Sequence, residues 1–165
     1  MLHLVDRLAA LSERDRELAA GEVLFRSRDP VTDMFLVVGG AIRLTRTLPH
    51  GLQLTLQHAG AGAILAEASF FAERYHCEAM ASEPSLLRIV PRRRLASAFV
   101  VDRDLAQAWA RHLAGEVQRT RAVAEILSLK TVAERLDAWL ALNDGATPTH
   151  KGRWNQIAAE IGVTP

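Results

Sequence analysis

The densest group of chemically capable side chains in this sequence is His76, Cys77 and Glu78, which follow one another directly. Imidazole, thiolate and carboxylate groups all bind metals, but a zinc site needs three or four ligands. Neighbouring residues on a strand point to opposite faces, so His76 and Cys77 would rarely reach the same ion. A haem or metal site is therefore not expected here, and we expect Cys77 to be a small buried apolar side chain.

Cys77 is the only cysteine in the sequence, so it can form no disulfide within the chain. It also cannot supply the several thiolates that an iron–sulfur cluster requires. The six histidines are scattered and give no close pair for a metalloenzyme: His3, His50, His58, His76, His112 and His150. No arrangement of serine or cysteine with histidine and aspartate, and no phosphate-binding glycine motif, is visible. The sequence predicts a protein without catalytic activity.

The composition is that of an ordinary globular protein, with 165 residues, 49% hydrophobic and 24% charged. A formal net charge of +1 neither requires nor excludes a nucleic-acid partner, because a DNA-binding face can be local. Charges from Asp6 to Arg16 interrupt the apolar residues near the N-terminus, so no signal peptide is expected. No run approaches the roughly 18 apolar residues of a membrane span. We expect a soluble cytoplasmic protein with no membrane partner.

The segment between residues 21 and 90 has the pattern of short antiparallel strands. Ile42–Thr45 and Leu52–Leu56 alternate apolar and polar residues with period two, as half-buried strands do. The pair Gly39-Gly40 predicts a tight hairpin between two such strands. Several short strands in succession indicate an antiparallel roll or barrel. Residues 2–19, in contrast, are expected to form one or two short surface helices.

A long helical segment follows, from about residue 97 to 143, with no proline and only one glycine. Its small and apolar residues recur at steps of three and four, which places them on one stripe. The stripe consists of Ala106, Trp109, Leu113, Val117, Thr120, Ala124 and Leu127. We interpret it as a dimer interface with the same helix of a second subunit. Packing against the chain's own roll is the alternative.

The last residues resemble the beginning of a DNA-reading motif. Residues 154–161 predict a short amphipathic helix, and Gly162 predicts a turn after it. Thr164 and Pro165 then read as the N-cap and first position of a second helix, which would enter the major groove of DNA. The sequence stops there, so we expect this 165-residue form to bind DNA weakly and with strong salt dependence.

This order of elements, together with several sequence segments, resembles the cyclic-AMP receptor and fumarate–nitrate regulator (Crp/Fnr) superfamily of bacterial transcription regulators. The segments are 21–25, 29–30, 34–44, 62–71, 131–136 and 157–165. The resemblance implies an α+β fold: an antiparallel β-roll, or double-stranded β-helix, like the cyclic nucleotide-binding domain. A long dimerisation helix and a truncated winged helix-turn-helix would follow. The implied domains are 1–98, 99–128 and 129–165.

The resemblance also implies an effector pocket. Residues 66–71 match the family's phosphate-binding cassette. Glu67 matches its ribose-binding glutamate, whereas Ala66 replaces its usual glycine. Thr120 matches a threonine that contacts the base. The complete predicted pocket is Ala66, Glu67, Ala68, Ser69, His76, Cys77, Glu78 and Thr120.

The same comparison argues against an ordinary cyclic nucleotide. His76, Cys77 and Glu78 stand where the nucleotide binders have an arginine and a serine or threonine, and a carboxylate would repel the phosphate. The pocket holds another effector or none, and its identity is unknown. Glu67 has a second interpretation, in which it caps a helix or pairs with Arg74.

The basic run Arg92–Arg94 has two interpretations, a contact with RNA polymerase or the DNA backbone, or a solvated corner between strand and helix. Trp109, Trp139 and Trp154 are interpreted as core or interface residues. The favoured hypothesis is a homodimeric, effector-responsive DNA-binding regulator. The alternatives are a stand-alone small-molecule-binding module with a non-functional tail, and a cupin-type metalloenzyme.

Overall fold

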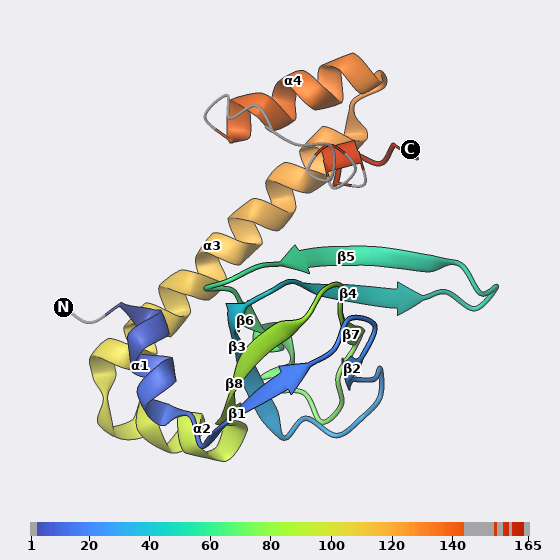
Figure 1. Ribbon diagram of the computed structural model, residues 1–165. Helices are drawn as coiled ribbons and strands as arrows, with labels where there is room; N and C mark the ends of the chain where they lie inside the picture. Colours follow the sequence, from blue (N-terminus) through green and yellow to red (C-terminus); the bar gives the residue numbers. More distant parts are fainter. Residues whose placement is uncertain (1–2, 144–153, 155–156, 159, 164–165) are drawn as a thin grey trace. The chain divides into compact units, whose positions relative to one another are not determined.

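The computed structural model describes residues 3–143, 154, 157–158 and 160–163. They divide into two compact units, residues 1–110 and residues 111–165. The first unit contains two β-sheets, two helices and the beginning of a third helix (Figure 1). The second unit contains the rest of that third helix and the helical residues that follow it.

The two sheets each have four strands, and all the pairings between their strands are antiparallel. In order across the first sheet the strands are β1 (Arg14–Leu18), β8 (Ser85–Pro91), β3 (Asp33–Gly39) and β6 (Ile64–Leu65). Across the second they are β2 (Val23–Phe25), β7 (Glu78–Ala81), β4 (Ile42–Thr47) and β5 (Gln53–Ala59). The antiparallel roll that the sequence predicted is therefore confirmed.

The core between the sheets follows from the period-two alternation of strands such as β8. On β8, Leu87 and Ile89 are buried while Arg88 between them is only partly covered. Phe35 of β3 pairs with Ile89 in the first sheet and stacks on Phe25 of the second, with ring centroids 5.5 Å apart. Alternate side chains of both sheets thus meet in one apolar layer.

The opposite face of the first sheet is covered by helices α1 (Leu4–Leu11) and α2 (Arg92–Val101) (Figure 1). Leu8 and Leu95 are fully buried side chains of these helices. Because both faces of β3 are covered, four consecutive residues of that strand, 34–37, are all buried.

The hairpin predicted at Gly39-Gly40 was wrong. β3 ends at Gly39 and β4 begins at Ile42, but the two strands belong to different sheets and do not pair with each other. The glycines instead form a tight turn that passes from one sheet to the other, a difference that turn residues alone do not reveal. Gly40 has φ +81°, and a Cβ there would lie 2.6 Å from the Cα of Ser85 and closer still to the Pro84 carbonyl oxygen. Ser85 occupies this space because its Oγ accepts a hydrogen bond from the Ala41 amide at 3.1 Å. Glycine is therefore required at position 40 by both conformation and space.

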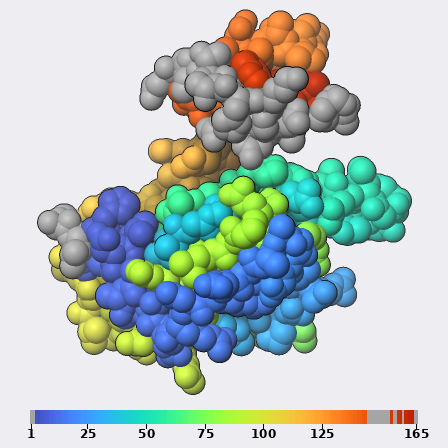
Figure 2. Space-filling model, in the orientation of Figure 1, coloured from blue at the N-terminus to red at the C-terminus, as the bar shows by residue number. Residues whose placement is uncertain are grey.

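The hairpin of β4 and β5 projects beyond the rest of its sheet as an arm (Figures 1 and 2). A register shift between Leu44 and Thr45 interrupts its pairing. Three leucines on alternate positions of this arm remain exposed: Leu52, Leu54 and Leu56.

The expectation of helix throughout residues 2–19 was wrong in its second half. Residues 4–11 form α1, but Arg14–Leu18 is strand β1, paired with β8 along its whole length. The many charges of this segment resemble a surface helix in sequence. An edge strand can carry such charges because one of its faces and one of its edges meet water.

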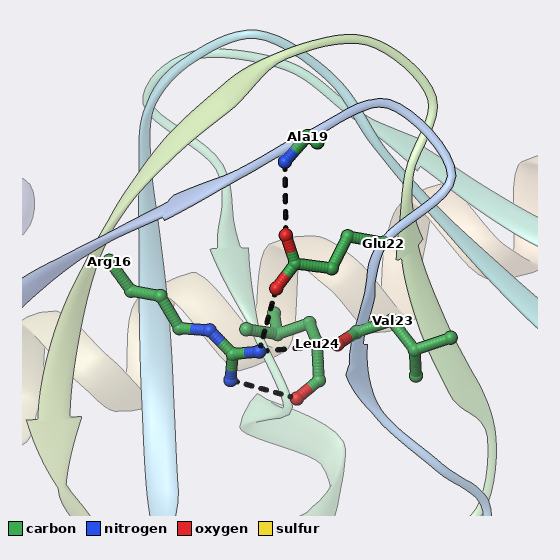
Figure 3. Close-up of polar contacts among 5 residues, drawn as sticks. All are labelled: Arg16, Ala19, Glu22, Val23 and Leu24. Atoms are coloured by element: carbon green, nitrogen blue, oxygen red, sulfur yellow. Dashed lines mark hydrogen bonds and ion pairs between the residues drawn. The ribbon is translucent and has the colours of Figure 1, made fainter.

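Arg16 of β1 connects the two sheets (Figure 3). Its guanidinium donates to the carbonyl oxygens of Val23 and Leu24, each at 3.3 Å, and lies 3.4 Å from the Glu22 carboxylate. Glu22 in turn accepts from the Ala19 amide at 3.1 Å. β1 and β2 are edge strands of different sheets, so these hydrogen bonds link the edges of the two sheets.

The long helix is α3 (Arg103–Ser128), which begins four residues later than the predicted boundary at 99. Residues up to Val101 belong to α2, and Asp102 interrupts the helix with extended backbone angles, φ −114° and ψ 91°. Its carboxylate accepts from the Leu105 amide at 2.9 Å and from Arg7 at 2.6 Å. An aspartate that caps the next helix ends the one before it, a break that apolar periodicity does not reveal.

In the second unit, α4 (Val132–Leu142) begins with a capping box. The Thr131 hydroxyl accepts from the Glu134 amide at 3.2 Å, and the Glu134 carboxylate accepts from the Thr131 amide at 2.9 Å. The buried side chains of this unit form one cluster of Ile126, Trp139, Ile157 and Ile161.

Gly162 has φ +71°, in agreement with the turn predicted there. The predicted loop at 143–150 beyond Asn143, and the residues Thr164 and Pro165, lie outside the described residues. Within the part of the chain that the structure describes, none of the helices is both long and apolar enough to cross a membrane.

The environment of Gly40 predicts the effect of two matched substitutions. Gly40→Ala is expected to lower the free energy of unfolding by about 2 kcal/mol or more, because it adds left-handed strain and a clash with backbone. Gly39→Ala is the control, since a Cβ there would meet no atom within 4 Å. Urea unfolding measures both, and equal stabilities of the two variants would contradict this account.

Candidate effector site

The segment that resembles the phosphate cassette begins directly after strand β6. Ala66 is buried and left-handed, with φ 68° and ψ 8°, and it precedes the single 3-10 turn η1 (Glu67–Ser69). Residues with a Cβ rarely adopt this conformation, which explains why the related cassettes have glycine here. The fold keeps the same turn although alanine makes it more strained.

The amides of the turn are largely used within the turn itself. Ser69 donates to the Ala66 carbonyl at 2.9 Å, and Phe70 donates to the Glu67 carbonyl at 3.1 Å. These two N–H groups are therefore not available to an anion, although the sequence suggested that a short helix would offer them.

The turn is tied to the strand that follows it by a pair of polar side chains. The Ser69 hydroxyl, 1% exposed, lies 2.9 Å from Nδ1 of His76. Partial burial of the ring lowers the pKa of His76, and the nearby charge of Arg46 lowers it further. His76 is thus neutral at pH 7, and the nitrogen nearest the cassette is already engaged by Ser69.

Cys77 is buried, as expected for a lone cysteine. It lies close enough to Glu67 to be affected by its charge. Burial raises the pKa of the Cys77 thiol to about 11; the Glu67 charge adds to this effect and the Arg46 charge opposes it. Glu67 and Cys77 therefore lie close together, and His76 is joined to the same turn through Ser69. Arg46 of β4 joins them, and its Nε donates to the His76 carbonyl at 3.3 Å.

Other predicted pocket residues have different environments. Ala68 is exposed, and Glu78 is half-buried on β7 opposite Thr45 of β4. Arg74, considered as a partner of Glu67, donates instead to the Arg28 carbonyl at 2.8 Å. Thr120 belongs to the second unit, where its hydroxyl donates to the Glu116 carbonyl at 2.8 Å.

The electrostatics of this site do not suit a phosphate. Glu67 contributes negative charge beside Cys77, His76 is neutral, and Cys77 is a protonated thiol at pH 7. Arg46 contributes positive charge, but its side chain is engaged with the backbone of His76. The site is better suited to a neutral or cationic group than to a phosphodiester, since an anion would face the Glu67 carboxylate without a free guanidinium.

Arg46 is the site residue that the sequence analysis missed. It lies on β4, a strand that was predicted, but the pattern of a single strand does not show that β7 is its pairing partner. The sequence signal that could have pointed to it is the position of a basic residue, Arg46, near the end of the alternating strand β4.

Two of the three tryptophans are core residues. Trp109, proposed for the dimer stripe, is 4% exposed and packs on Phe70 and Phe99, with ring centroids 5.7 and 5.6 Å away. It is therefore buried against its own chain. Trp139 is also buried and donates from Nε1 to the Glu160 carboxylate at 2.8 Å, whereas Trp154 is 40% exposed.

The basic run at the start of α2 is divided between two roles. Arg92 donates to the carbonyl oxygens of Ala72 at 2.8 Å and Val31 at 3.4 Å, so it fastens loops of the roll. Arg93 and Arg94 are exposed, and Arg94 lies 3.9 Å from Glu13. Among the described residues, no group of three or more histidine, cysteine, aspartate or glutamate side chains could hold a metal ion.

The protonation of Cys77 leads to a testable expectation. Raising the thiol pKa from 9.0 to about 11 lowers the thiolate fraction at pH 8 about a hundredfold. Iodoacetamide should therefore modify the folded protein at least that much more slowly than the urea-unfolded chain, as followed by mass spectrometry. The folded rate should keep rising with pH beyond 9, and a plateau near pH 9 would contradict this environment.

Comparison with known proteins agrees with this architecture. Residues 15–101, more than half of the chain, match the model of the cyclic nucleotide-binding domain. Electron transport regulator A of Shewanella oneidensis is 28% identical over 138 residues, which are 83% of this chain and 55% of the relative. The chain thus spans about half the length of this curated relative.

Two solved structures show the same fold at lower identity. FixK2 from Bradyrhizobium japonicum has a TM-score of 0.75 at 20% identity, covering 92% of this chain and 78% of its own. The catabolite activator protein of Thermus thermophilus has a TM-score of 0.63 at 22% identity, covering 98% and 76%. These neighbours are regulatory proteins, and the chain belongs to the cyclic nucleotide-binding domain family with the fold of the Crp/Fnr transcription regulators.

Proposed function

We propose that this chain is the sensing and dimerising part of an effector-responsive, DNA-binding transcription regulator that acts as a homodimer in the cytoplasm. The observation that carries the proposal is an exposed apolar stripe on α3 within a chain of this family. Val117 is 50% exposed and Leu127 is 42% exposed, and Thr120 and Ala124 between them are exposed as well. They recur at steps of three and four on one face, as the seam of a paired helix does.

Water contact of this stripe would be unfavourable, and burial against the same stripe of a second copy would relieve it. Trp109 takes no direct part in the interface in this proposal, because it is buried in its own unit. The interface is therefore assigned to the later part of the predicted set, from Leu113 to Leu127.

The effector is proposed to bind at the cassette and to be something other than an ordinary cyclic nucleotide. The support is the charge distribution: the Glu67 carboxylate is close to a protonated Cys77, and His76 beside them is neutral. The predicted contact of Thr120 with such an effector stays part of this proposal.

DNA binding is proposed for the second unit. Its packed cluster around Trp139 and the turn at Gly162 support a helix-turn-helix, of which Thr164 and Pro165 would begin the reading helix. RNA polymerase is a proposed partner, and Arg93 and Arg94 are the exposed cations available for it.

Dimerisation can be tested with one charge placed on and off the stripe. Val117→Asp should convert the dimer to monomer in sedimentation velocity, weakening association at least tenfold, because it buries an unpaired charge. Gln118→Asp introduces the same charge at an exposed neighbouring position off the stripe and should leave the dimer intact. A monomeric wild type, or equal effects of both variants, would refute the proposed interface.

The effector class can be tested by calorimetric titration with cyclic AMP. We expect a dissociation constant weaker than about 1 mM, because the phosphate would lie beside the Glu67 carboxylate while Arg46 is engaged with the His76 carbonyl. Micromolar binding would overturn the assignment of the cassette. If cyclic AMP does not bind, mass spectrometry of the small molecules that co-purify with the protein would identify the ligand.

A further inference from the structure

A cavity at the open end of the roll is separate from the cassette and has no role in the function proposed above. Strand β1 contributes two arginines to it, Arg14 and Arg16, whose backbones pair with Ile89 and Leu87 of β8. Ile89 and Leu87 belong to the buried face of their sheet. Both arginines therefore point from β1 toward the space between the sheets rather than away from it.

The two arginines differ in what they contact. Arg16 is held by Glu22 and by the carbonyl groups of Val23 and Leu24, as Figure 3 shows. Arg14, two residues earlier on the same face, has no hydrogen bond or ion pair with any side chain of the described residues. Its guanidinium is thus a cation in the lining of the cavity, and it makes no polar contact that stabilises the described fold.

The cavity has a volume of about 300 Å³, which is at the small end of the range for ligand sites. Its floor is apolar and largely aromatic, formed by Leu24, Phe25, Phe35, Tyr75 and Ile89. The rings of Phe25 and Tyr75 are stacked with centroids 4.0 Å apart, so this surface is rigid.

Two carboxylates lie on the rim together with Arg14. Asp29 uses Oδ2 to accept from the Arg26 amide at 2.9 Å, and Asp33 uses Oδ2 to accept from the Thr32 hydroxyl at 2.8 Å. Each leaves a second carboxylate oxygen that these bonds do not use. The charge of Asp33 is also felt by Tyr75, whose hydroxyl donates to the Asp33 carbonyl at 2.8 Å.

We propose that this cavity binds a free α-amino acid with an apolar side chain. Arg14 binds the carboxylate, Asp29 and Asp33 receive the ammonium group, and the side chain lies on the aromatic floor. A simple anion would face the two aspartates, and a simple cation would face the two arginines. A molecule that carries both charges at one end and an apolar group at the other matches the whole lining.

L-Phenylalanine and two analogues provide a direct test by calorimetry or by NMR titration of amide resonances. 3-Phenylpropanoate lacks the ammonium group and phenethylamine lacks the carboxylate, while both keep the aromatic side chain. We expect saturable binding of phenylalanine, with each analogue at least tenfold weaker. The absence of saturable binding up to about 10 mM phenylalanine, or equal binding of either analogue, would overturn the proposal.

Matched variants locate the site. Arg14→Gln should weaken phenylalanine binding at least tenfold, and Asp29→Asn should weaken it several-fold while keeping an oxygen for the Arg26 amide. Arg88→Gln is the control, because Arg88 lies on the opposite face of the same sheet, 3.7 Å from Asp15. A loss with Arg88→Gln equal to that with Arg14→Gln would place the binding elsewhere.

Discussion

The whole molecule depends on the burial of alternate side chains between two four-stranded sheets. Each strand presents one set of residues to this layer, so a slip of one position would place Leu87 and Ile89 outside and Arg88 inside. Register is therefore fixed strongly, and with it the positions of every loop that carries chemistry. Arg16 completes this arrangement by joining β1 of one sheet to the carbonyl groups of β2 in the other.

The cassette shows how one backbone frame can hold a different chemistry. The left-handed turn at Ala66 and the 3-10 turn after it are set by the backbone between β6 and β7, and Ala66 adopts φ 68° although it carries a Cβ. The side chains on this frame are then free to change. Here a Ser69–His76 hydrogen bond and a protonated Cys77 lie beside the turn.

Several features of the fold could be predicted from the sequence because they depend on local physics. Gly39-Gly40 marked a tight turn, since at position 40 only glycine fits the positive φ and the space beside Ser85, although the turn joins the two sheets and not a paired hairpin. The alternation of residues 42–45 marked β4. Strand β1 could not be predicted, because its five residues carry charge at four positions and pair with β8, some seventy residues away. This long-range strand pairing overrides the local secondary-structure propensity of the segment.

The candidate site was predictable in part. Glu67, Ser69, His76 and Cys77 belong to one short stretch, residues 66–78, and they were grouped by the resemblance of that stretch to the family's cassette. Arg46 reaches the group only through the pairing of β4 with β7, which the sequence does not reveal. Trp109 shows the matching limit on helices, since an apolar stripe looks the same whether it faces its own chain or a partner.

The position of Trp109 joins the cassette turn to the helices that follow the roll. Phe70 directly follows the 3-10 turn, and its ring packs on both Phe99 of α2 and Trp109 of α3. Close-packed aromatic rings resist compression, so a shift of the turn would have to move these neighbours or cost packing energy. Asp102 lies between the two helices with extended backbone angles, and its carboxylate is held by the Leu105 amide and by Arg7 of α1. The turn that carries Glu67 and the first turn of α3 therefore belong to one packed unit, residues 1–110.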